Sequence, residues 1–163
     1  MDKIATQVAR RVLAALPTES DLTGTVGTLR AIQGELRKFK AWSTGFDETL
    51  DAAQKHSTDA PDGLVWQDDL VEFWAPFGPI QQRLFDLEDK LDPEVSASVD
   101  QFIDEPRAAR IEEAINDPKF LKRDGQDAIA YSEKELRAWY AAFTWWVEYG
   151  ISGINDAIQR ISV

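Results

Sequence analysis

Three groups of closely spaced carboxylates are the residues of this chain best suited to chemistry. They are Asp68-Asp69-Glu72, Glu88-Asp89-Asp92 and Glu112-Glu113. On a helix, Asp68 and Glu72 share one face, as do Glu88 and Asp92. Such pairs could hold Mg²⁺, which takes one or two protein carboxylates together with water and substrate phosphates. One alternative function is therefore a divalent-metal-dependent hydrolase.

The other parts of a catalytic constellation are missing from the sequence. A helical nucleotide hydrolase needs glutamate pairs on two facing helices, and Glu112-Glu113 has no matching second pair. The 163 residues contain no Cys and one His, which excludes thiol catalysis, disulfides and zinc sites that need Cys or paired His. That residue, His56, lies in a polar linker, and no phosphate-binding or nucleophile-elbow motif occurs. We therefore predict no catalytic residues, no metal and no cofactor.

Charge is distributed unevenly along the chain. Lys and Arg number 18 and Asp and Glu number 29, which gives a net charge of −11. Residues 47–105 contain sixteen acidic and three basic side chains, so the middle third carries −13. An acidic helical face is often only solvated surface. It can also steer the encounter with a partner of opposite charge.

The leading prediction is a non-enzymatic protein-interaction module of the inhibitor, antitoxin or immunity type. Its acidic surface would bind a protein partner that presents a basic surface. The predicted acidic contact residues are Asp68, Asp69, Glu72, Asp86, Glu88, Asp89 and Asp92.

The last predicted helix is apolar around most of its circumference. A helix of this kind is buried between neighbours or binds a partner. The first interpretation makes it the central helix of a bundle. The second makes Trp145 and Tyr149, together with Trp74 from an earlier helix, exposed aromatic anchors, because Trp and Tyr are enriched at binding hot spots. Self-association through these residues is the alternative to a different protein partner.

A small basic cluster on the second predicted helix suggests another alternative. It consists of Arg30, Arg37, Lys38 and Lys40. A small helical subunit of a nucleoprotein complex could contact nucleic acid through these residues. A nucleic-acid site usually has a broader basic footprint, and a chain this acidic is repelled by phosphates. We therefore expect nucleic-acid contact only within a larger complex.

Apolar periodicity predicts an all-α fold, a bundle of about five to seven helices forming one domain over residues 1–163. Two long spine helices are expected over about 20–55 and 133–162. A first helix is expected over 4–16, a linker over 56–63, and shorter helices, several begun by proline, over 64–117. Glycines in the first spine helix predict a late start near Val26 or a break near Gly45.

Two local signals refine this architecture. Asp124-Gly125 is a two-residue turn between apolar runs, which predicts a small β-hairpin near 119–131. Ser132 and Glu135 have the spacing of a capping box and predict the start of the last helix. Leu64 and Trp66 are assigned to a short helix that follows the linker.

Neither a membrane span nor a secretory signal is predicted. Residues 138–155 carry Glu148 as their one charge and touch the lower length limit for a span. Their polar residues and central aromatics argue against insertion into lipid. Near the N-terminus, Arg10 and Arg11 interrupt the apolar run that a secretory signal needs. We expect a cytoplasmic protein.

Overall fold

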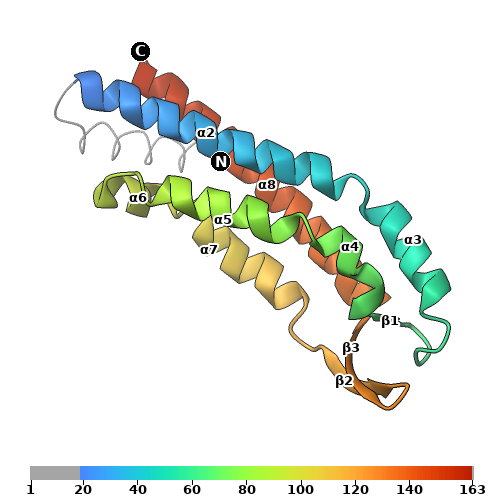
Figure 1. Ribbon diagram of the computed structural model, residues 1–163. Helices are drawn as coiled ribbons and strands as arrows, with labels where there is room; N and C mark the ends of the chain where they lie inside the picture. The colour runs from blue at the N-terminus through green and yellow to red at the C-terminus, as the bar shows by residue number, and fades with distance from the viewer. Residues whose placement is uncertain (1–18, 163) are drawn as a thin grey trace.

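The computed structural model describes residues 19–162 and is mostly helical (Figure 1). The helix predicted over 4–16 lies outside these residues. The two long helices α2 (Glu19–Ser43) and α8 (Glu133–Ser162) run side by side in opposite directions. A small sheet lies at one end of this pair. The predicted mostly helical fold is confirmed, but the sheet has one strand more than the predicted hairpin, and the spine helix predicted over about 20–55 is interrupted near Gly45.

The break predicted near Gly45 is confirmed. Helix α2 ends at Ser43, a turn contains Thr44 and Gly45, and α3 (Phe46–His56) follows. The apolar stripe of these two helices is buried: Leu29, Ile32, Leu36, Phe39, Phe46, Leu50 and Ala53. The late start near Val26 is wrong, because α2 begins at Glu19. The glycines lower helix propensity by about 1 kcal/mol each, but they leave α2 unbroken.

The middle of the chain folds into short helical segments. These are η1 (Gln67–Leu70), α4 (Val71–Trp74), α5 (Phe77–Glu88), α6 (Pro93–Val99), α7 (Asp104–Pro106) and the π-helix η2 (Arg107–Glu112). Helix α5 packs on α2, whereas η2 packs on α8. Pro93 occupies the first turn of α6, and the Asp92 carboxylate caps that helix by accepting the Glu94 N–H at 3.1 Å.

The sheet has three antiparallel strands in the order β1-β3-β2. They are β1 (Leu64–Trp66), β2 (Lys119–Arg123) and β3 (Gln126–Ser132). The predicted hairpin is confirmed: Asp124 and Gly125 have φ values of 50° and 79°, as a tight two-residue hairpin turn requires. The helix assigned to Leu64 and Trp66 is wrong, because these residues pair with Ser132 and Ala130 of β3.

Helix α8 packs against α2, η2 and β3, so it is the central helix of the structure. Its N-terminus has the predicted capping box: Ser132 Oγ accepts the Glu135 N–H at 3.0 Å and donates to the Glu135 carboxylate at 3.0 Å. Its buried side chains include Leu136, Trp139 and Phe143. Among the described residues, no helix is both long enough and apolar enough to span a membrane.

Candidate functional site

The seven predicted acidic contact residues do not form one surface. Asp68 and Glu72 are exposed on η1 and α4, whereas Asp86 and Asp89 are exposed at the C-terminal end of α5. Helix α5 has 12 residues and therefore spans roughly 18 Å at 1.5 Å per residue. That length separates the two exposed pairs.

Three of the seven residues have other roles within the fold. Asp92 is the cap of α6 and remains exposed. Asp69 is bound by Ser57 and Arg123, and its side chain is 15 % exposed. Glu88 is buried, with 6 % of its surface exposed. For Asp69 and Glu88 the prediction of an open acidic contact is therefore wrong, because tertiary packing covers both carboxylates.

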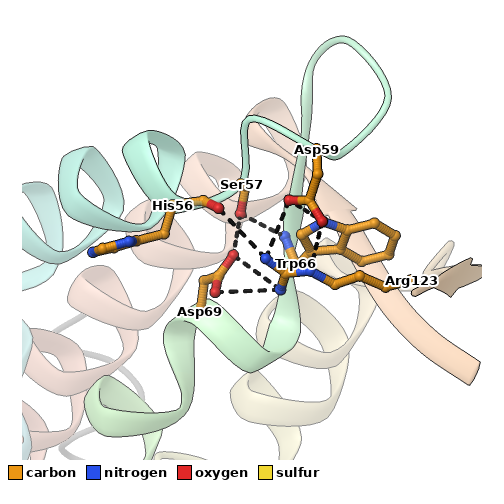
Figure 2. Close-up of polar contacts among 6 residues, drawn as sticks. All are labelled: His56, Ser57, Asp59, Trp66, Asp69 and Arg123. Carbon is orange, nitrogen blue, oxygen red and sulfur yellow. Dashed lines mark hydrogen bonds and ion pairs between the residues drawn. The ribbon is translucent and has the colours of Figure 1, made fainter. Parts of the chain in front are cut away.

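Arg123 on β2 forms a network that we call the Arg123 clamp. It contains His56, Ser57, Asp59, Trp66, Asp69 and Arg123 (Figure 2). Arg123 Nε donates to Asp59 Oδ2 at 2.8 Å, and Nη1 lies 3.3 Å from both Asp69 carboxylate oxygens. Ser57 Oγ donates to Asp69 Oδ2 at 2.6 Å and accepts the Trp66 N–H at 3.1 Å.

The clamp fixes the hairpin to η1. The hydrogen bond from Arg123 is the main reason that the pKa of Asp59 is lowered, so the pair is charged at neutral pH. The His56 carbonyl accepts from Arg123 at 3.4 Å, while its imidazole points away from the network (Figure 2). We therefore assign a positioning role to the clamp and no proton-transfer role to His56.

A hollow of about 590 Å³ lies between η1, α4 and η2 and opens to solvent. Its apolar lining includes Trp74, Phe77, Ile111, Ile115, Tyr131 and Trp139. Val71 lies at this hollow with 62 % of its surface exposed. The charged lining consists of Asp68, Arg107 and Glu112, and Arg107 Nη2 lies 3.9 Å from Glu112 Oε1.

A second hollow of about 730 Å³ lies against the hairpin. Its lining includes Phe120, which is 76 % exposed, and the ion pair between Lys122 and Asp127. Gln67 and Asp68 line both hollows, so the two adjoin along η1. We call the combined surface the η1 groove.

Asp68 is the common charged residue of the groove. Among the described residues, the other charged side chains that line the two hollows are paired, Arg107 with Glu112 and Lys122 with Asp127. No ion pair involving Asp68 is found in the described part of the chain. The groove thus combines apolar side chains with two ion pairs and with Asp68, a carboxylate shared by both hollows.

The three predicted aromatic anchors lie in different environments. Trp74 is half-buried at the groove, where it packs edge-on against Trp139 with ring centroids 4.7 Å apart. Trp145 is 37 % exposed and stacks on Tyr149 at 4.9 Å. Tyr149 itself is only 7 % exposed and packs on Phe102. The prediction of Tyr149 as an exposed anchor is wrong, because its helix face meets the segment after α6.

The predicted basic cluster is partly neutralised within the fold. Lys38 donates to Glu35 at 2.7 Å, and Lys40 lies 2.5 Å from Glu148. Burial alone would raise the pKa of Glu35, but hydrogen bonds from Lys38 and Arg83 outweigh burial and lower it. Arg30 and Arg37 are exposed on α2, so two cations of the cluster face solvent without a described ion pair.

A carboxylate cluster lies at the C-terminal end of α5, where Glu88 is buried and Asp100 and Asp104 are half-buried. One carboxylate oxygen each from Glu88, Asp100 and Asp104 lies within 4.8 Å of the others. Burial, followed by the charges of Asp104, Asp100 and Asp89, raises the pKa of Glu88 to about 8, and the charge of Arg107 opposes that rise. Burial and the hydrogen bond with Asp104 raise the pKa of Asp100.

No sequence signal marked Asp100 and Asp104 as neighbours of Glu88, because the turn after α6 brings them together. The sequence likewise gave no signal for Val71 and Phe120, since their exposure depends on how η1 and the hairpin pack.

Comparisons with models of known protein families, with curated proteins and with solved structures found no match to this chain.

Proposed function

We propose that this protein is a binding module that holds a short segment of a partner protein in the η1 groove. The observation that carries the proposal is the exposure of Val71 and Phe120 at two adjoining hollows whose lining includes several apolar side chains. Large exposed apolar side chains around a concave surface are typical of interaction sites. The proposal keeps the protein-partner class predicted from the sequence and moves the contact from the acidic helices to the groove.

The lining of the groove supports a specific chemistry for the partner segment. Its apolar side chains favour an apolar face on the partner, and aromatic residues such as Trp74 and Phe120 favour tight packing. Asp68 lies where the two hollows adjoin and favours one Lys or Arg on that face. The segment we propose is therefore apolar and carries a central basic residue.

The openness of the hollows favours a peptide segment over a small molecule. Small-molecule sites commonly cover about 70–90 % of the ligand surface. Both hollows are open to solvent, and they adjoin at Gln67 and Asp68, so one elongated ligand could enter both. The Arg123 clamp supports the proposal, because it holds the hairpin that carries Phe120 against η1. Binding surfaces that are ordered in advance lose less entropy when the partner binds.

A display experiment with random peptides of about 12–16 residues tests the proposal. That length spans roughly 18–24 Å as a helix. Peptides should be selected on the full chain and their affinities measured by calorimetry. We expect enriched peptides that combine apolar residues with a central Lys or Arg.

Matched variants then locate the binding site. Val71→Asp and Phe120→Ser should each weaken binding at least tenfold, whereas Trp145→Ser, which changes an exposed aromatic outside the groove, should leave the affinity unchanged. Asp68→Asn should weaken binding and reduce its dependence on salt. Peptides that bind Val71→Asp and Phe120→Ser as tightly as the unmodified chain would refute the proposal, as would a failure to enrich any peptide.

A further inference from the structure

A different part of the molecule has the properties of a cation site. Glu88 is the last residue of α5, Asp100 follows α6, and Asp104 begins α7. The turn between the two aspartates is closed by backbone bonds, because the Asp100 carbonyl accepts from the N–H groups of Asp104 at 3.0 Å and Glu105 at 3.1 Å. The backbone bonds of this turn therefore hold Asp100 and Asp104 close together, and the packing of α5 brings Glu88 next to them.

Glu88 is an unusual member of an acidic cluster. It is 94 % buried, and its Oε1 atom has no hydrogen-bond partner among the described residues. No Lys or Arg in the described part of the chain forms an ion pair with Glu88, Asp100 or Asp104. Arg107 follows α7 but pairs with Glu112 instead. A buried carboxylate without a partner is costly, and the charge of Arg107 opposes only part of the rise in the pKa of Glu88.

The donor set indicates which cation would fit. The donor set consists of carboxylate oxygens, which suit hard cations such as Ca²⁺ and Mg²⁺. Two oxygens on opposite sides of Ca²⁺ lie about 4.6–5.2 Å apart, since each bond is about 2.3–2.6 Å long. The three oxygens lie within 4.8 Å of one another, so one Ca²⁺ can reach all of them. Three protein carboxylates exceed the one or two that Mg²⁺ usually takes, so the site favours Ca²⁺.

We propose that Glu88, Asp100 and Asp104 form a calcium-binding site that joins the end of α5 to the turn between α6 and α7. Phe102 and Ile103 in that turn are buried, and the Ile103 carbonyl accepts the Trp146 indole N–H from α8 at 2.8 Å. The bound ion would hold this turn, which is bonded to α8, against the end of α5. This site is separate from the η1 groove, and neither proposal depends on the other.

Calcium titration of the full chain, stripped of metal with EDTA, tests the site. Calorimetry should show one saturable site, and the melting temperature should rise with Ca²⁺ because only the folded chain binds the ion. Glu88→Gln and Asp104→Asn should both abolish the calcium response. Asp86→Asn is the matched control, since it removes an exposed carboxylate from the same helix, and it should keep the full response.

The variants remain informative even where stability changes. In EDTA at neutral pH, Glu88→Gln should melt at a higher temperature than the unmodified chain, because the folded chain no longer has to keep a proton on this residue, while the variant gains nothing from Ca²⁺. Absence of saturable binding up to about 10 mM, well above the roughly 1 mM of weak protein sites, would overturn the proposal. An equal calcium response in Glu88→Gln, or tighter binding of Mg²⁺ than of Ca²⁺, would overturn it as well.

Discussion

Replacing Glu88 by Gln should stabilise the metal-free protein in a strongly pH-dependent way. Burial and the neighbouring charges of Asp104, Asp100 and Asp89 raise the pKa of Glu88 from 4.5 to about 8, and Arg107 only partly offsets them. Between these two values the folded chain keeps a proton on Glu88 that the unfolded chain has released. The contribution of Glu88 to the free energy of unfolding is therefore present in full below pH 4.5, and it falls as the pH rises towards 8.

The size of the effect follows from the width of this interval. Each pH unit within it lowers the free energy of unfolding by about 1.4 kcal/mol. Over the whole interval the loss is roughly 5 kcal/mol at most, which is a large part of the 5–15 kcal/mol typical of a folded domain. Gln resembles the protonated form of Glu88 in shape and has no proton to release. The variant should match the unmodified chain near pH 4 and exceed it increasingly up to pH 8.

Urea unfolding followed by tryptophan fluorescence measures this difference. Curves should be recorded in EDTA at several pH values between about 4 and 9, with Asp86→Asn as the control for loss of one surface charge on α5. The difference between Glu88→Gln and the unmodified chain should grow with pH, while Asp86→Asn should show no comparable growth. A difference that is the same at every pH, or one that favours the unmodified chain at pH 8, would refute the reasoning.

Two further predictions concern the parts of the fold that carry the candidate sites. Gly153→Ala should lower the free energy of unfolding by about 1–3 kcal/mol, because the new Cβ would lie 2.4 Å from a ring carbon of buried Phe102. Gly34→Ala should raise the free energy of unfolding by up to about 1 kcal/mol, because its new Cβ meets nothing within 4 Å. Urea unfolding curves in which the two variants do not change stability in opposite directions would contradict this packing. Arg123→Met should lower the melting temperature and speed amide exchange in the hairpin. The pKa of Asp59 is lowered by Arg123, so the stability lost in Arg123→Met should be present above about pH 3.8 and should vanish in stronger acid, where Asp59 is protonated. Identical melting curves for the variant and the unmodified chain at pH 7 would contradict this prediction.

Elements defined by neighbouring residues could be predicted from the sequence. The capping box at Ser132 and the turn at Asp124-Gly125 lie where the spacing placed them. The apolar periodicity also predicted a helix over this segment, and Leu36 and Phe39 lie on the buried face of α2. These signals succeed because the interactions that they describe span only a few residues.

Elements that depend on distant pairing could not be predicted in the same way. Strand β1 has three residues and exists because it pairs with β3, more than sixty residues later in the chain. Its apolar residues fit a buried helix turn as well as a strand. The exposure of Phe120 has the same origin, since the strand order leaves β2 at the edge of the sheet.

The candidate sites show how tertiary contacts change the meaning of a charge. Asp68 and Asp69 are adjacent in the sequence, yet Asp68 is exposed in the groove and Asp69 is bound by Arg123. Glu88 belongs to an acidic run, yet its neighbours in space are Asp100 and Asp104. The distribution of charge along the sequence therefore identified the acidic segment, but it did not predict which of its carboxylates are exposed, paired or buried.

Chemical-shift mapping of a selected peptide tests the groove most directly. The indole N–H signals of Trp74 and Trp145 report on two different surfaces of the folded chain. Titration with the peptide should shift the Trp74 signal and the backbone signals of Val71 and Phe120, while Trp145 remains unchanged. Shifts at Trp145 without shifts at Trp74, Val71 and Phe120 would contradict the proposed binding surface.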